Sequence, residues 1–470
     1  MFLPSPGIVP IIIPSSLMKY VSTRGKSPAV GFAEAFANGL APDGGLYIPE
    51  SLPSLPPTLL LEDTPMPYPA LAWDFFNLFD TDHDTDELID LIDESYGSFS
   101  ETGIAPLQQL ADNLFILELF HGPTLAFKDF GLQLIGNLFE HQIRRTGETI
   151  NVLGATSGDT GSAAIHGLAK KEGVNVFILY PKGRISALQE RQMTCTAAKN
   201  IFPIPIEGTF DDAQRIVKEL MSDLEVKKKL RLSAINSINM VRVLAQSVYY
   251  VHAYMQLPPE NRDDVHFAVP TGNFGNVLAG WLAYRMGLPV ERFIVATNQN
   301  DILYKLFTTG EYASGDVHPS LAPSMDIQIA SNFERFLYYH CNEDPKKTAS
   351  QMAKIAKTGK LKLPDFDADI FTATRCSDED ILANIQRVKE DYSYVVDPHT
   401  ACAFQEVDPD RTTVVLGTAS PAKFPDVIKK AIGETPTDPL LEVLKKRKQV
   451  RYPVDANADA VRQFIEAHSA

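Results

Sequence analysis

The sequence predicts an α/β fold. From about residue 112 onward, short apolar runs that suit strands alternate with longer segments of helical periodicity, which is the pattern of layered α/β proteins. Two segments, 149–171 and 267–286, each read as a strand, a glycine-bearing turn and a helix. The chain of 470 residues is long enough for two or three domains with a substantial core.

Apolar runs and helical periodicity place the individual elements. Strands are expected at Leu114–Leu119, Thr149–Leu153, Asn175–Tyr180, Phe202–Ile206, Phe267–Val269, Phe293–Ala296 and Thr413–Leu416. Helices are expected at Asp211–Leu224, Val241–Met255, Asp378–Asp391 and Ala422–Ile432. A further helix should follow the acidic run 80–86, with Asp84 or Thr85 as its cap. Residues 300–375 have no clear pattern and are expected to be irregular.

Composition excludes several classes of protein. A hydrophobic content of 44% and a charged content of 22% are typical of globular proteins. The net charge of −16 argues against nucleic acid as a partner, because binding to its phosphates needs a basic surface. The four cysteines lack paired spacing, which predicts free thiols in a reducing cytoplasm rather than disulfides or a zinc site. No apolar run reaches the length of a membrane span. No motif decides between a monomer and a homodimer.

The run 121–131, which reads His-Gly-Pro-Thr-Leu-Ala-Phe-Lys-Asp-Phe-Gly, is the most informative part of the chain. Lys128 lies between Phe127 and Phe130. Desolvation lowers the pKa of a lysine and leaves a neutral amine, which can form a Schiff base with a carbonyl cofactor. The alternative is a surface lysine whose stem packs on the aromatic rings. Asp129 is expected to cap the helix that follows.

Two turns could bind anionic or polar ligands. In the turn 272–276, which reads Gly-Asn-Phe-Gly-Asn, backbone N–H groups at a helix N-terminus would form an anion site, although this is neither a Walker A loop nor G-x-G-x-x-G. The turn 154–162 contains five hydroxyl or carboxylate residues, more than helix capping needs, which favours ligand binding. The alternatives are an ordinary βα turn in the first case and N-capping in the second.

These motifs, taken together and in order, resemble the threonine synthase family of pyridoxal-phosphate (PLP) enzymes of fold type II. Segments 20–25 and 39–49 also resemble its bacterial and fungal branch. The resemblance runs from Met18 to about residue 433. The motifs are the lysine run, Ala155–Gly161, Asn236–Asn239, Gly272–Gly275 and Leu416–Ala419.

The resemblance implies a tryptophan synthase β-like architecture, with two α/β lobes, PLP in the cleft between them and an N-terminal domain. The N-terminal domain would span 18–105 and the catalytic region 106–433, with a variable region at about 300–375. Residues 434–470 would form a C-terminal tail. Residues 1–17 lack the features of a signal or transit peptide, and we interpret them as a disordered extension or a misassigned start.

The resemblance also implies roles for the residues of the motifs. Lys128 would hold PLP and act as general base and acid. Thr418 would be the hydroxyl partner of the pyridine nitrogen, although the residues alone favour a cap of the helix at Ala422. The phosphate of PLP would contact Gly272, Asn273, Phe274 and Asn276.

The implied substrate is O-phospho-L-homoserine, whose phosphate suits a forked basic side chain such as Arg242. Lys182 and Arg184 form a second basic cluster, which either binds phosphate or lies in a solvated loop. The residues expected to bind the substrate are Thr156, Ser157, Asp159, Thr160, Ser237, Asn239 and Arg242.

The implied reaction is a γ-elimination of phosphate followed by β-hydration, which gives L-threonine in the last step of threonine biosynthesis (EC 4.2.3.1). Two alternatives share the fold: a phospho-lyase that eliminates phosphate without hydration, and a dehydratase or cysteine synthase that needs no Arg242. A non-catalytic ligand-binding relative is a third alternative, against which the retention of Lys128 argues.

Overall fold

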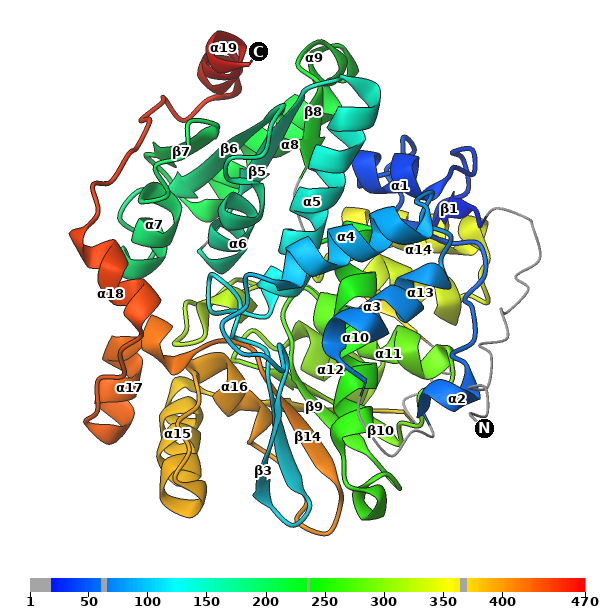
Figure 1. Cartoon of the computed structure of the whole chain (residues 1–470), viewed down its shortest axis with the longest axis vertical. Coiled ribbons are helices and arrows are strands. Elements are labelled where there is room, and N and C mark those ends of the chain that lie inside the picture. The colour runs from blue at the N-terminus through cyan, green and yellow to red at the C-terminus, as the bar shows by residue number, and fades with distance from the viewer. Residues whose placement is uncertain (1–17, 61–65, 157, 235–236, 364–369, 470) are drawn as a thin grey trace, which may run out of the picture.

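The structure is a computed structural model that describes residues 18–60, 66–156, 158–234, 237–363 and 370–469, and it is organised around two sheets (Figure 1). The expectation for residues 1–17 lies outside the described residues. The larger sheet has the spatial order β13 (Phe371–Arg375), β10 (Arg292–Thr297), β9 (His266–Pro270), β14 (Thr413–Gly417), β4 (Leu114–Glu118) and β3 (Leu107–Ala111). The smaller sheet has the order β7 (Ile201–Ile206), β6 (Val174–Pro181), β5 (Ile150–Ala155) and β8 (Leu232–Ala234).

Neighbouring strands in both sheets are parallel, except that β3 runs antiparallel to β4. All seven strands expected from the sequence are present, each within two residues of its predicted ends. Their cores are buried on both faces, which explains why they read as continuous apolar runs rather than as alternating patterns.

The N-terminal region contributes a small antiparallel sheet and four helices. Its strands are β1 (Tyr20–Ser22) and β2 (Tyr47–Pro49). Its helices are α1 (Phe32–Asn38), α2 (Pro57–Leu60), α3 (Tyr68–Asn77) and α4 (Thr85–Tyr96). Asp84 caps α4 in a capping box with Glu87, as the acidic run predicted.

The remaining helices follow in chain order. Between residues 120 and 265 they are α5 (Lys128–Thr146), α6 (Asp159–Leu168), α7 (Ala187–Thr194), α8 (Phe210–Ser222), α9 (Leu224–Lys229), α10 (Met240–Gln256) and the short 3-10 helix η1 (Pro259–Asn261). Beyond them lie α11 (Gly275–Arg285), α12 (Ile302–Thr309), η2 (Pro323–Met325), α13 (Phe333–His340), α14 (Pro345–Thr358), α15 (Asp378–Tyr392), α16 (Pro398–Ala403), η3 (Pro421–Lys423), α17 (Pro425–Ile432), α18 (Pro439–Lys446) and α19 (Ala458–His468).

Residues 300–375 were expected to be irregular, and for the described part of this stretch that expectation is wrong. It contains α12, α13, α14, β13 and the antiparallel pair β11 (Glu311–Ala313) and β12 (Lys360–Lys362). The elements are short and joined by turns, so no long periodic run marks them. One signal was present: Asp344 caps α14 and Pro345 occupies its first position.

The C-terminal part also differs from expectation. The helix predicted at Ala422–Ile432 is divided into η3 and α17, because Pro425 has no N–H to continue the first helix and instead begins the second. The described part of the expected C-terminal tail, 434–469, contains α18 and α19. From α17, beside the larger sheet, the chain passes through α18 to α19, which lies beside the smaller sheet (Figure 1). Val461 and Ile465 of α19 pack in one cluster with Phe202 of β7.

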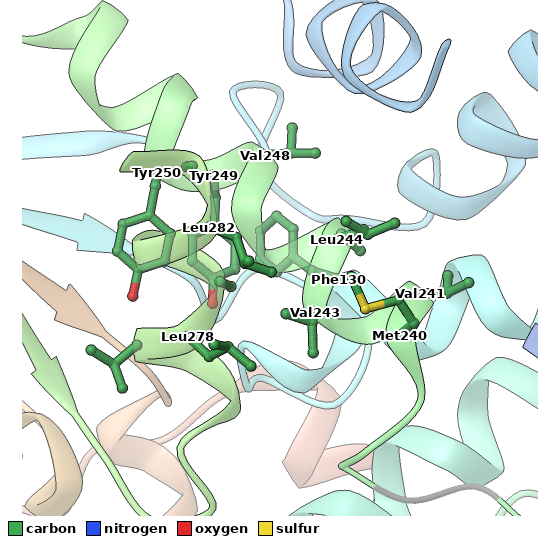
Figure 2. Packing of buried hydrophobic residues seen from close by; sticks show 14 of the residues in the cluster. Phe130, Met240, Val241, Val243, Leu244, Val248, Tyr249, Tyr250, Leu278 and Leu282 are labelled. Atoms are coloured by element: carbon green, nitrogen blue, oxygen red, sulfur yellow. The ribbon is translucent and has the colours of Figure 1, made fainter. Parts of the chain in front are cut away.

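Helix α10 is the centre of the largest hydrophobic cluster. Its residues from Met240 to Met255 are all buried, so protein surrounds the helix on every side. Val243, Leu244 and Tyr249 of α10 pack with Phe130 of α5 and with Leu278 and Leu282 of α11 (Figure 2). Polar side chains on such a helix are costly unless they are hydrogen-bonded. Arg242 and Gln246 each carry buried polar atoms that have no partner among the described residues, which draws attention to both.

Buried polar contacts connect the N-terminal region to the loop before α10. The Glu334 carboxylate at the start of α13 accepts hydrogen bonds from Thr23 Oγ1 at 2.7 Å and from Arg24 Nη2 at 2.8 Å. Its neighbour Arg335 is fully buried and donates to the carbonyl oxygens of Tyr47 and Ile238. The N-terminal motifs therefore help to hold the loop that carries Ser237. None of the helices in the described ranges is long and apolar enough to cross a membrane.

Candidate active site

A cavity lies where the carboxyl ends of β5, β9 and β14 approach one another. Open α/β sheets bind ligands at this edge, because the loops that follow parallel strands meet there. The cavity is lined by Lys128 of α5, by Asp159 and Thr160 of α6, by the turn 271–276, and by Thr418 after β14.

Lys128 is the first residue of α5 and is almost fully buried. Burial lowers the pKa of its ammonium group, and the positive charges of Lys423 and Arg242 lower it further, whereas Asp159 opposes them. Its Nζ lies 3.6 Å from Asp159 Oδ2 and 3.4 Å from Ser324 Oγ. The side chain is therefore a desolvated amine that faces the cavity, as the nucleophile of a Schiff base must be.

Asp159 is the first residue of α6, and its carboxylate is held on both oxygens. Oδ1 lies 2.9 Å from Lys423 Nζ and accepts a hydrogen bond of 3.0 Å from Gln189 Nε2. Oδ2 accepts a hydrogen bond of 3.3 Å from Ser324 Oγ. Although burial alone would raise its pKa, the nearby Lys423 and Lys128 hold that pKa far below its ordinary value, so the carboxylate is ionised.

The turn 271–274 ends at the N-terminus of α11, which begins at Gly275. Phe274 is left-handed, with a φ of +63°, and no side chain caps the helix. The first N–H groups of α11 therefore remain available to an anion. A Cβ at Gly272 would lie 2.9 Å from the Ser324 carbonyl oxygen, so this close approach requires a glycine.

Asn276 adds a side-chain donor to this turn. Its Oδ1 accepts hydrogen bonds from the hydroxyl groups of Tyr249 at 2.5 Å and Tyr250 at 3.0 Å. These bonds fix the orientation of the amide. Its Nδ2 is buried and has no hydrogen-bond partner among the described residues, so this donor is free for a ligand in the cavity.

Arg242 lines the same cavity from α10. The side chain is almost fully buried, and its Nε and Nη1 have no hydrogen-bond partner in the described part of the chain. Burial lowers its pKa to about 10, so the guanidinium remains charged at neutral pH. A Cβ at Gly131 of α5 would lie 3.0 Å from Arg242 Cα, which explains the glycine at this crossing of α5 and α10.

Thr418 is placed by the segment that follows Asp397. The Asp397 carboxylate accepts the Thr400 hydroxyl proton, and Thr400 Oγ1 accepts a hydrogen bond of 3.0 Å from the Thr418 N–H. Because the Thr400 hydroxyl already donates its proton in a hydrogen bond to Asp397, it cannot also donate to Thr418 Oγ1, which lies 3.5 Å away. The proton of the Thr418 hydroxyl is therefore not fixed by Thr400 acting as a donor. Thr418 can direct its own proton to an acceptor in the cavity.

These groups fit PLP. The turn and the Asn276 amide suit its phosphate, Lys128 suits its aldehyde carbon, and the Thr418 hydroxyl suits its ring nitrogen. Two independent anion-binding elements, the α11 turn and the Arg242 guanidinium, open into one cavity. Two such elements would be needed by a phosphate-bearing cofactor and a phosphate-bearing substrate that bind together.

Family models cover most of the chain. A model described as pyridoxal-phosphate dependent enzyme matches residues 99–416, a model of the threonine synthase N terminus matches 19–96, and a model of the threonine synthase C-terminal region matches 398–465. The chain belongs to the threonine synthase family.

Individual relatives and structures agree with this assignment. The threonine synthase of Pseudomonas aeruginosa is 42% identical over 96% of this chain and 98% of its own, and that of Saccharomyces cerevisiae is 39% identical over 97% and 99%. The PLP-bound threonine synthase from Brucella melitensis superposes with a TM-score of 0.91 at 39% identity, over 96% of this chain and 99% of that one. The resemblance inferred from the motifs is confirmed, and the protein is a PLP-dependent lyase of this family.

The structure brings most of the residues expected in a threonine synthase site to the cavity. Those that line it are Lys128, Asp159, Thr160, Ser237, Arg242, Gly272, Asn273, Phe274, Asn276 and Thr418. Ser157 lies outside the described residues. The alternative role for Thr418 as a helix cap is excluded, because Ser420 Oγ accepts the hydrogen bond from the N–H of Ala422 instead.

Two expected substrate contacts need correction. Thr156 Oγ1 accepts hydrogen bonds from the N–H groups of Gly158 and Gly161, so this hydroxyl holds its own turn. Asn239 caps α10 with Oδ1 and donates from Nδ2 to the Phe36 carbonyl oxygen. Neither residue is on the cavity lining, and both polar groups are used by the fold.

Two further expectations also change. Asp129 was expected to cap α5, but it lies within the helix and its carboxylate accepts hydrogen bonds from Thr124 N at 2.8 Å and Thr124 Oγ1 at 2.7 Å. It thus holds the turn before the lysine. Lys182 is exposed and paired with Glu207, and neither it nor Arg184 lines the cavity, as the solvated-loop alternative predicted.

Five residues in or next to the site were not expected from the sequence: Gln246, Ser324, Asp397, His399 and Lys423. Gln246 had a signal, because it is polar within an apolar helix and lies one turn after Arg242. The run Asp-Pro-His-Thr at 397–400 had the form of a helix start but no chemical signature. Ser324 lies in the stretch that was expected to be irregular.

Proposed function

We propose that this protein converts O-phospho-L-homoserine and water to L-threonine and phosphate. The observation that carries the proposal is the buried guanidinium of Arg242, which lacks partners at Nε and Nη1 among the described residues and shares a cavity with Lys128. A charged group is rarely left in this state unless a ligand completes its pairing. A phosphate on the substrate would do so, with bidentate geometry.

The side chains of the cavity have distinct roles in the proposed reaction. Bound PLP supplies an electron sink for the carbons of the amino acid. Lys128 Nζ carries protons to and from the substrate carbons, a task for which its lowered pKa suits it. Ser324 Oγ, which is within hydrogen-bond distance of both Lys128 and Asp159, positions the amine. Thr160 and Ser237 supply hydroxyl groups on the substrate side of the cavity.

The phosphate leaves from Cγ with its bridging oxygen, and water adds at Cβ. Arg242 stabilises the negative charge that grows on the departing phosphate, because its positive charge is desolvated and fixed. The cavity must then admit one water molecule while the substrate remains bound. We propose a cytoplasmic location, because none of the four cysteines forms a disulfide.

Product analysis tests the proposal. The PLP-loaded protein is incubated with O-phospho-L-homoserine, and threonine, phosphate, 2-oxobutyrate and ammonia are measured in the same sample. Equal amounts of threonine and phosphate are expected. Phosphate with 2-oxobutyrate and ammonia would instead identify a phospho-lyase, because elimination without hydration gives an unsaturated amino acid that hydrolyses to these products. Activity on free serine or threonine that exceeds activity on the phosphorylated substrate would identify a dehydratase.

A further inference from the structure

Lys423 is a buried lysine for which the proposed reaction has no role. Its side chain is 1% exposed, it lies at the end of η3, and it does not line the cavity. A buried ammonium is strongly unfavourable unless it is paired and hydrogen-bonded. The contacts of Lys423 should therefore explain how its buried charge is stabilised.

Its contacts lead directly to the lysine of the site. Lys423 Nζ lies 2.9 Å from Asp159 Oδ1 and donates a hydrogen bond of 2.6 Å to the Thr124 carbonyl oxygen. The other oxygen of Asp159 lies 3.6 Å from Lys128 Nζ. One buried carboxylate thus stands between two lysines, and the shorter, better hydrogen-bonded pair is the one with Lys423.

We propose that Lys423 is the permanent counterion of Asp159 and so leaves Lys128 as the uncharged, reactive amine. This inference depends on the proposed role of Lys128. One carboxylate balances one ammonium in a low-dielectric site, so a second proton on the other lysine would leave an uncompensated buried charge. Lys423 Nζ is held by Thr124 and Asp159 together, whereas Lys128 Nζ makes the longer contact with Asp159, so Lys423 is the better placed of the two to carry the ammonium. Lys423 is a positioning residue in this account, because it acts through Asp159.

The other charged groups around Lys128 do not change this balance. Arg242 on α10 is positive and acts in the same direction as Lys423. His399 on α16 is neutral, because its Nε2 accepts the Ser324 N–H at 3.1 Å and its Nδ1 proton is directed to Asp397 at 2.7 Å. The carboxylate of Asp129 on α5 accepts hydrogen bonds from the Thr124 N–H and hydroxyl groups, and its charge interacts with that of Lys423, so it adds to the pairing of Lys423.

The capture of PLP by the apoenzyme measures this effect without turnover. Condensation joins Lys128 Nζ to the aldehyde carbon of PLP and releases the aldehyde oxygen as water, so only the unprotonated amine reacts. Apoenzyme is mixed with PLP for a fixed short time at a series of pH values and quenched with borohydride, and the fraction of Lys128 that carries the label is measured by peptide mass spectrometry.

Two variants at Lys423 remove the charge in different ways. Lys423→Gln keeps an uncharged N–H donor that is one bond nearer the backbone, and Lys423→Met keeps the length of the apolar stem. Either variant is sufficient if the other does not fold. With its counterion gone, Asp159 is balanced by Lys128 alone, which keeps its proton. Labelling at pH 7 should fall about tenfold for each unit by which the midpoint rises, and should recover at higher pH. Asp159→Asn should move the midpoint in the opposite direction.

The outcomes separate this inference from the proposed function. An unchanged midpoint in a folded Lys423 variant, or a shift in the same direction as that of Asp159→Asn, would overturn the inference. Label at a lysine other than Lys128 in the wild-type protein would overturn the proposed role of Lys128 itself. Lys128→Ala serves as the control for background labelling.

Discussion

Lys128 and Asp159 are the first residues of two helices, α5 and α6, and their side chains meet with 3.6 Å between Nζ and Oδ2. The two helices come close because glycines face each other where they cross. A Cβ at Gly136 would lie 1.9 Å from the Gly167 carbonyl oxygen, and a Cβ at Gly167 would lie 2.3 Å from that of Leu132. The spacing of the pair in the cavity therefore depends on two glycines distant from it.

Gly136→Ala should test this dependence. The added methyl group has no room, so α5 and α6 must separate, and we expect a loss of stability of about 1–3 kcal/mol together with weaker cofactor binding. Thermal unfolding and PLP titration measure the two effects. Gly103→Ala is the matched control, because the nearest atom to its Cβ would be 3.8 Å away. Equal behaviour of the two variants would show that the helix crossing tolerates the methyl group.

Asn276→Ala should weaken the binding of PLP more than that of pyridoxal, which lacks the phosphate. The variant removes the buried Nδ2 donor and also leaves the Tyr249 hydroxyl without its acceptor, whereas the Tyr250 hydroxyl keeps the backbone carbonyl oxygen of residue 276. A charge-assisted hydrogen bond contributes about 1.5–3 kcal/mol, which corresponds to a change of roughly 10- to 150-fold. Dissociation constants of both ligands from spectroscopic titration give the ratio. If the two affinities fall equally, Asn276 does not contact the phosphate.

Arg242→Met should reduce kcat/KM for O-phospho-L-homoserine by about 100-fold or more, because the substrate phosphate loses its fixed positive charge. Methionine keeps the packing of the stem against α5. The affinity for PLP and for L-threonine, which has no phosphate, should change little. A loss of PLP affinity with an unchanged KM would instead assign Arg242 to the cofactor.

Asp129 should make the stability of the protein depend on pH. Burial raises the pKa of its carboxyl from 3.8 to about 6, so the native state binds this proton more tightly than the unfolded state. The contribution of this proton to the free energy of unfolding is complete below about pH 4 and is lost as the pH rises through 6. Two pKa units correspond to about 3 kcal/mol. Denaturant unfolding at pH 4 and pH 7 should show this loss in the wild-type protein and not in Asp129→Asn. Asp90→Asn on the exposed face of α4 should behave like the wild type.

The sequence was sufficient for features that are local. Seven strands of the two sheets, the cap at Asp84 and the strand–turn–helix at 267–286 each follow from residues that are neighbours in the chain. The strands β3, β8 and β13 of these sheets were not predicted. Lys128 was identified for the same reason, because its apolar neighbours already indicated a desolvated amine.

The sequence was insufficient where distant segments meet. Nothing near Lys423 indicates that it pairs with Asp159, which lies 264 positions earlier in the chain. Thr156 and Asn239 were expected to bind the substrate, but neither lines the cavity, and a hydroxyl or amide that holds the fold looks the same in a sequence as one that binds a ligand. Ser324 was missed because short elements joined by turns leave no periodic signal.

The most direct test of the proposed reaction is to run it in water enriched in ¹⁸O. Elimination breaks the bond between Cγ and oxygen, and the solvent then adds at Cβ. We therefore expect threonine with one ¹⁸O atom in its hydroxyl group and phosphate without label, both measured by mass spectrometry before any exchange. Labelled phosphate would show that the bond between phosphorus and oxygen breaks, which is a hydrolysis, and it would contradict the account.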